Sequence, residues 1–148
     1  MELKSDFEKF ELGLSEEIKG YLSETAKWAY FLSIVGFVGL GLMVLFGLFF
    51  GTIMGAAMEN LYDVGYSAGL GMVYVVLALI YFFPILYLYK FSKKMKTALS
   101  SNNNEALAAS FLNLKSHYKF VGIFTIIILS LYLLIFIFGI IGGFAAAM

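Results

Sequence analysis

Residues 28–58 read WAYFLSIVGFVGLGLMVLFGLFFGTIMGAAM and contain no charged side chain. A transmembrane helix needs about 20 apolar residues to cross a hydrocarbon core about 30 Å thick. This stretch is longer than one crossing requires, so it must tilt, protrude from the membrane or break near Gly51 or Gly55. We therefore predict the first transmembrane span here.

Two further apolar stretches, residues 70–89 and 120–144, predict a second and a third span. Separate segments cross a bilayer as helices, because their backbone polar groups must be satisfied internally. The chain is 61% hydrophobic and 14% charged, whereas soluble domains are about 45–50% apolar and about 25% charged. A soluble fold of 148 residues could not cover that much apolar surface. We expect one all-α membrane domain, residues 1–148, whose spans are solvated by the lipid bilayer.

Residues 1–27 are polar and acid-rich, unlike a basic secretory leader, so we expect the first span to remain as an anchor. Their apolar side chains recur every three or four residues, which is typical of one face of a helix. Ser15, followed by two glutamates, is expected to start this helix as its cap. We predict an N-terminal amphipathic helix that packs on the cytoplasmic region or lies in the membrane surface. Its apolar face comprises Phe7, Phe10, Leu14, Ile18 and Tyr21.

Residues 90–119, between the second and third spans, contain two apolar stripes separated by a polar run, residues 100–104. We predict that the two spans continue here as a helical hairpin whose turn lies in that run. Asn104 is expected to cap the second helix, with Glu105 in its first turn. The first stripe comprises Phe91, Met95 and Leu99, and the second comprises Leu107, Phe111, Leu114 and Tyr118.

The distribution of lysine predicts the orientation in the membrane. Four of the ten lysines precede the first span and six lie in residues 90–119, whereas residues 59–69 carry only Glu59 and Asp63. Positive charge is retained on the cytoplasmic side of a membrane. We therefore place the N-terminus and residues 90–119 in the cytoplasm and the C-terminus outside.

Gly47, Gly51 and Gly55 recur every four residues and so share one face of the first span. Without side chains, two helix backbones can approach closely, which strengthens dispersion packing in lipid. This helix-packing stripe predicts either a face for self-association or a partner, or an internal contact with another span. We favour the internal contact, because such motifs are common in membrane spans.

Pro84 lies within the second span and leaves the carbonyl group of Ile80 without its helical partner. This arrangement predicts a hinge or kink at Pro84. A gating hinge is one interpretation. A static bend is the preferred one, because membrane helices tolerate proline without gating.

The three spans lack Asp, Glu, Lys, Arg and His in their cores, and such groups are the usual marks of proton relays and ion-coupled transport. Cysteine is absent, and His117 is the single histidine, which we interpret as a surface or packing residue. Glu59 and Asp63 alone make an incomplete site for Ca²⁺ or Mg²⁺. We expect no catalytic residue, metal site or cofactor. The net charge of zero argues against nucleic acid as a partner.

Two segments, LSEEIKGYLSETAKWAYFLSIVGFVGLG (residues 14–41) and KFSKKMKTALSSNNNEALAASFLNLKSHYKFVG (residues 90–122), resemble an uncharacterised family of small bacterial inner-membrane proteins. The resemblance implies a multi-pass protein of the bacterial inner membrane and assigns no functional residue. From the residues we expect a non-enzymatic accessory or scaffold subunit that acts through helix–helix contacts with other membrane subunits. The alternative is a homo-oligomeric passive channel or pore.

Overall fold

The computed structural model describes residues 14–57 and 64–147. Within these residues the chain forms three helices and no strand: α2 (Glu16–Ala57), α3 (Val64–Ser101) and α4 (Asn104–Ala147). Each helix is long and apolar enough to cross a membrane. The predicted all-α class, with three helices able to span a membrane, is therefore confirmed for the described residues. Phe7 and Phe10 of the predicted amphipathic face lie outside the described residues.

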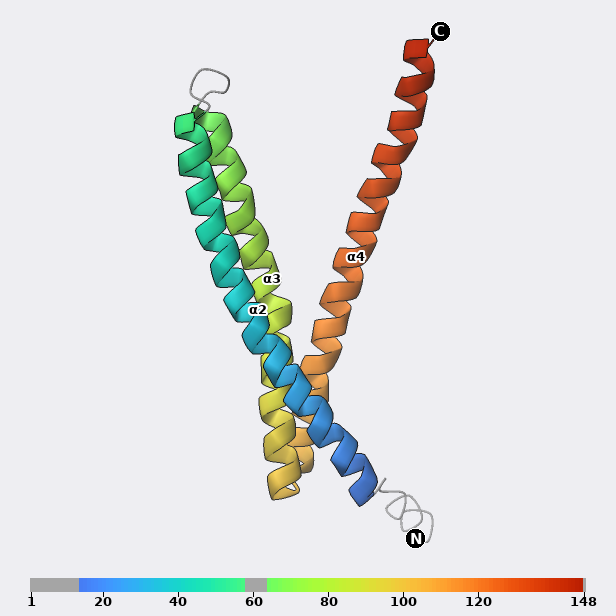
Figure 1. Cartoon of the computed structure of the whole chain (residues 1–148). Coiled ribbons are helices and arrows are strands. Elements are labelled where there is room, and N and C mark those ends of the chain that lie inside the picture. Colours follow the sequence, from blue (N-terminus) through green and yellow to red (C-terminus); the bar gives the residue numbers. More distant parts are fainter. Residues whose placement is uncertain (1–13, 58–63, 148) are drawn as a thin grey trace.

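Helix α3 packs against both of the other helices. Close backbone contacts join α3 to α2 and α3 to α4, and none joins α2 to α4 within the described residues. Figure 1 shows α2 and α3 running side by side, while α4 leaves the pair as it runs towards the C-terminus. The molecule therefore consists of a closely packed helix pair and a third helix that joins it at one end.

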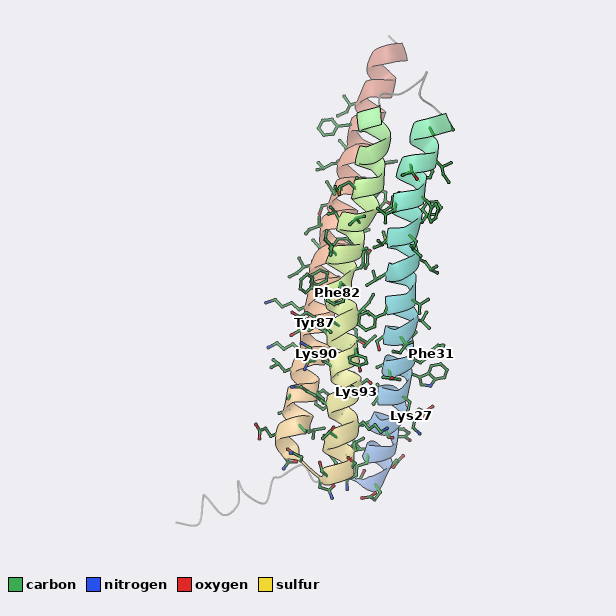
Figure 2. The ribbon with its side chains drawn as sticks, turned by 90° about the vertical axis from the view of Figure 1, so that its left-hand side faces the viewer. Lys27, Phe31, Phe82, Tyr87, Lys90 and Lys93 are labelled. Atoms are coloured by element: carbon green, nitrogen blue, oxygen red, sulfur yellow. The ribbon has the colours of Figure 1, made fainter. Side chains whose placement is uncertain are left out.

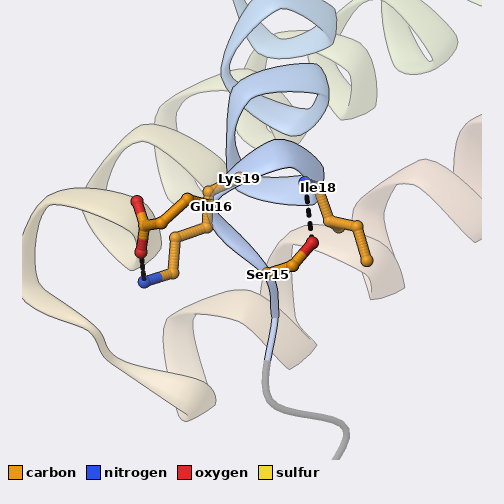
Figure 3. Close-up of polar contacts among 4 residues, drawn as sticks. All are labelled: Ser15, Glu16, Ile18 and Lys19. Atoms are coloured by element: carbon orange, nitrogen blue, oxygen red, sulfur yellow. Dashed lines mark hydrogen bonds and ion pairs between the residues drawn. The ribbon is translucent and has the colours of Figure 1, made fainter.

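Helix α2 begins with the cap that the sequence predicts. The backbone N–H of Ile18 donates a hydrogen bond to Ser15 Oγ at 3.3 Å, and Lys19 Nζ lies 2.8 Å from Glu16 Oε1 (Figure 3). The helix then continues without interruption to Ala57, through both suggested break points. Residues 16–27 are thus the first turns of the spanning helix itself.

The turn between α3 and α4 consists of Asn102 and Asn103, which have different roles. Asn102 adopts a left-handed backbone conformation with φ of 46°. A residue in this conformation directly after a helix terminates it, because the chain then turns back towards the last helical turn. The N–H of Asn103 donates to the Ala98 carbonyl at 3.1 Å, and Asn103 Oδ1 accepts from the Ala106 N–H at 3.0 Å. The cap of α4 is therefore Asn103, and the prediction of Asn104 is wrong by one residue.

A small core lies at the end of the molecule where α3 turns into α4. Phe91 and Met95 of α3 are 1% and 0% exposed and pack against Ala26 and Ala29 of α2. The predicted stripe of Phe91, Met95 and Leu99 therefore faces inward. Five leucines surround this core: Leu22, Leu88, Leu99, Leu107 and Leu114.

The second predicted stripe, on α4, is only half correct. Leu107 and Leu114 pack on the core, but Phe111 and Tyr118 are 44% and 66% exposed. Ser110 is fully buried instead, with Oγ 4.0 Å from Met95 Sδ. A small side chain at the contact lets α4 approach α3 closely, and this rotates the larger residues outward.

Candidate helix-packing site

Gly47 of α2 and Gly71 of α3 bring two helix backbones into direct contact. A Cβ atom added at Gly47 would lie 2.7 Å from Tyr74 Cβ and 3.0 Å from the Gly71 carbonyl oxygen. One added at Gly71 would lie 2.6 Å from the Gly47 carbonyl oxygen and 3.3 Å from Gly51 Cα. These separations leave no space for side chains. Gly47 and Gly51 of the predicted stripe thus face α3 and not an external partner.

The third member of the stripe, Gly55, lies in α2 one turn beyond Gly51. Its surroundings fall outside what the structure describes. At the other end of the same seam, a Cβ added at Gly36 would lie 3.0 Å from the Ile85 side chain. The contact of α2 with α3 therefore extends over four turns, from Gly36 to Gly51.

Aromatic rings fill the sides of this seam. The Tyr74 ring lies 5.6 Å from the Phe46 ring and 6.4 Å from the Phe50 ring. The ring centroids of Phe37 and Phe82 are 5.8 Å apart. Apolar contacts gain little from exclusion of water inside a bilayer, so close packing of this kind is what holds two spans together. Close glycine contacts and aromatic rings therefore stabilise the pairing of α2 with α3.

Pro84 marks the place where α4 is attached to α3. The helix α3 continues on both sides of this buried residue, so the expected hinge or kink stays a prediction. His117 Nδ1 of α4 lies 2.8 Å from the Pro84 carbonyl oxygen. A carbonyl oxygen only accepts, so Nδ1 carries the proton in this hydrogen bond. The single histidine thus has a packing role between helices.

Beyond this junction α4 loses contact with the rest of the chain. The Tyr81 and Phe124 rings, 5.1 Å apart, form an aromatic pair between α3 and α4 next to it. None of residues 125–143, all of which the structure describes, is buried. We call these residues the diverging segment of α4 (Figure 1). A Cβ added at Gly139 or Gly143 in this segment would meet nothing within 4 Å.

The hydroxyl groups of the spans bond to their own helices. Ser33, Thr52 and Ser130 donate to carbonyl oxygens of Tyr30, Leu48 and Ile126 at 2.7, 3.1 and 2.8 Å. Such bonds satisfy the hydroxyl without a partner on another helix. In the part of the chain that the structure describes, no three His, Cys, Asp or Glu residues come together to hold a metal ion.

Two residues of this site were not identified from the sequence. Gly71 lies six and two residues after Gly65 and Gly69, so it forms no four-residue glycine repeat with them. His117 lies between Lys115 and Lys119 in the sequence, a pattern typical of a solvated segment. A stronger signal was its position near one end of the third span, where an imidazole beside an apolar helix requires a hydrogen-bond partner.

Comparison with known proteins gives one family match. The family of unknown function DUF5362 matches residues 64–140, which span α3 and most of α4. No curated protein and no solved structure matches the chain. The matched region contains Pro84, His117 and most of the diverging segment, so the α3–α4 junction lies inside the family's shared part.

Proposed function

Because the chain belongs to the family of unknown function DUF5362, we propose its function from the geometry: a non-enzymatic accessory or scaffold subunit that binds another membrane protein. The diverging segment of α4 is the binding element. One observation carries the proposal: residues 129–143 of α4, which make up most of the predicted third span, are all exposed and stand apart from α2 and α3 (Figure 1).

The partner that suits this segment is a second membrane helix with small residues on one face. Residues 125–143 carry no charge, so ion pairing offers no specificity there. Gly139 and Gly143 are one turn apart on the same face, and the space beside both is open. Paired small residues allow a neighbouring backbone to approach, which is the common basis of association between spans. The internal glycine seam, already occupied by α3, is not available for this purpose.

The orientation that fits this role places the N-terminus and the α3–α4 turn in the cytoplasm and the C-terminus outside. The bacterial inner membrane is the proposed location, with residues 90–119 as a cytoplasmic helical hairpin and the N-terminal amphipathic residues beside it. The lysine distribution supports this orientation. The α3–α4 turn end also holds the compact core that a water-exposed region requires.

The alternative, a homo-oligomeric pore, gains no support from the side chains. A pore needs polar groups directed towards a shared axis. Ser33, Thr52 and Ser130 instead donate to carbonyl oxygens of their own helices. The crosslinking experiment described next distinguishes a scaffold subunit from a homo-oligomeric pore.

Site-specific photo-crosslinking in membranes tests the proposal. A photoreactive residue replaces Leu131, Tyr132, Leu133 or Leu134 in turn, which together sample every side of α4. Leu42 and Leu45, exposed on α2, serve as controls. We expect a protein adduct from one face of α4 only, and a complex of fixed stoichiometry that survives mild detergent.

Gly139→Leu should abolish this complex, whereas Gly41→Leu, at another open position, should leave it intact. An adduct at twice the chain mass of 16.5 kDa would show that α4 binds a second copy of this chain, which favours the homo-oligomer over the scaffold. Equal labelling of all four positions and both controls, or lipid adducts alone, would show that α4 faces only lipid and would refute the proposed function.

A further inference from the structure

A cavity lined by three lysines lies between α2 and α3, next to the core. Its volume is about 550 Å³, and its polar lining comes from Ser23, Lys27 and Tyr30 of α2 and from Ser92, Lys93 and Lys96 of α3. Figure 2 shows Lys27 and Lys93 at neighbouring levels on the two helices. We call this cavity the lysine groove.

The lysine groove holds three positive charges and no acidic side chain among its described lining residues. Within residues 14–57 and 64–147 the only ion pair joins Lys19 to Glu16. Lys27, Lys93 and Lys96 therefore have no described carboxylate partner. Like charges gathered at one place repel one another, so an anion bound between them is favoured electrostatically.

Aromatic rings hold one of these cations in place. Lys93 Nζ lies 5.2 Å from the centroid of the Tyr30 ring and 5.7 Å from that of Tyr89. A cation over a ring face is attracted by the ring's electrons, but its charge is not neutralised. Lys93 thus lines the groove beside two aromatic rings, and the buried hydroxyl-bearing residue Ser92 lies next to it.

The position of the groove along the helices indicates which kind of anion it binds. Lys27 is the last charged residue before the uncharged part of α2, and Lys90 is the first after the uncharged part of α3. Tyr30, a residue type that favours the headgroup level, lines the groove. Towards the apolar side, the Tyr89 ring contacts those of Tyr30 and Phe37 at 5.8 and 6.0 Å. Charged and apolar surface therefore meet along one seam.

We propose that the lysine groove binds the phosphate group of an anionic phospholipid, with its acyl chains along Tyr89 and Phe37. Lysine ammonium groups bind phosphate as point charges that several headgroup types can satisfy. A soluble phosphate would use the same three cations and make no use of the apolar seam. Basic pockets between membrane helices are suited to anionic headgroups in this way. This site is separate from the diverging segment of α4, so its test does not depend on a protein partner.

Native mass spectrometry of the full chain tests the proposal. The chain is released from nanodiscs that contain equal amounts of phosphatidylglycerol and phosphatidylcholine, and the retained lipid is identified. The wild-type chain should retain phosphatidylglycerol selectively. Each Lys→Gln change in the groove should weaken retention about fivefold, and the triple variant Lys27→Gln, Lys93→Gln, Lys96→Gln on the order of a hundredfold.

A charge-matched triple, Lys90→Gln, Lys94→Gln, Lys115→Gln, removes three lysines that do not line the groove. It should retain phosphatidylglycerol within about twofold of the wild type. The triple variant with arginine at positions 27, 93 and 96 should also retain it, and circular dichroism checks that all variants are helical. Equal losses in both glutamine triples, or equal retention of phosphatidylcholine, would overturn the proposal. Displacement of the lipid by millimolar glycerol phosphate would overturn the lipid as ligand and assign the groove to soluble phosphates.

Discussion

Glycines in α2 share the lack of a side chain but differ in what surrounds them. Gly36 and Gly47 lie against α3, whereas a Cβ added at Gly39 or Gly41 would meet nothing within 4 Å. Only the first two are required for close approach of the helices. The other two lower the helix propensity of α2 without a described contact in return. A stability measurement should therefore distinguish the enclosed glycines from the open ones.

We expect Gly47→Leu to destabilise the folded chain by about 1–3 kcal/mol, because a side chain there overlaps Tyr74 and the Gly71 backbone. Gly41→Leu, the matched control in the same helix, should be neutral or stabilise by up to about 1 kcal/mol. Thermal unfolding in detergent, followed by circular dichroism, measures both. Equal melting temperatures for the two variants would mean that α2 and α3 are not packed through glycine.

His117 is the other residue whose role depends on its contact. Its ring is the described side-chain donor that joins α4 to the backbone of α3, at the carbonyl of Pro84. Within the apolar part of a membrane protein, such a bond between helices contributes modestly, about 0.6 kcal/mol on average. The bond also fixes where along α3 the third helix is attached.

We expect His117→Phe, which keeps an aromatic ring but removes the donor, to lower stability by about 0.5–1.5 kcal/mol. It should also broaden the distance distribution between spin labels placed at Val76 on α3 and Leu131 on α4. Tyr118→Phe, at an exposed neighbour, is the control. Unchanged distances and stability in His117→Phe would show that the aromatic contacts alone attach α4.

At the scale of the element, each helix combines a water-exposed end with a lipid-exposed length. The core of Phe91, Met95, Ala26 and Ala29 lies among lysines, where water makes burial worth about 1.5–3 kcal/mol for a large side chain. The spans expose large apolar residues along most of their length, which lipid solvates without cost. Among the described residues, the buried cluster therefore lies at the lysine-rich end of the helices.

The turn between α3 and α4 gives the element-scale prediction. We expect Asn103→Ala to cost about 1 kcal/mol, because the cap to the Ala106 N–H is lost. Asn103→Asp should be nearly neutral, since a carboxylate also accepts this bond. Asn104→Ala, the control, changes the first residue of α4 and should have little effect. Chemical unfolding compares the three, and a larger cost at Asn104 than at Asn103 would contradict the described cap.

At the scale of the whole molecule, the three helices form a pair and an attached third helix. α4 meets α3 between the turn and Phe124 and then leaves it (Figure 1). The same end of the molecule carries the lysines that the structure describes, the turn and the core. This asymmetry between the two ends supports one orientation across the membrane.

We expect a reporter that is active only outside the cytoplasm to give signal when fused after Met148. The same reporter inserted at Asn103, in the exposed turn, should be silent, and a reporter active only in the cytoplasm should give the opposite pattern. Extracellular activity at position 103 would reverse the orientation and move the lysine groove to the other leaflet.

The sequence by itself determined the helical class and the number of helices able to cross a membrane, because hydrophobicity is a property of residues summed along a window. The orientation inferred from the lysines stays a prediction. The sequence also identified the cap at Ser15 and the inward face of Phe91 and Met95, where helical period alone decides the outcome. These signals are local, so no other part of the chain is needed to interpret them.

Tertiary structure alone decided which surfaces meet. The four-residue repeat predicts that Gly47 is a packing residue, but only the position of Gly71 in the structure shows that α3 encloses it. Phe111 has the period of a buried residue, but the close contact at Ser110 rotates it outward. His117 reaches Pro84 across 33 residues, and Lys27 joins Lys93 and Lys96 in one cavity although two spans separate them in the sequence. Such pairings depend on the angle and register of packed helices, which local residue patterns do not specify.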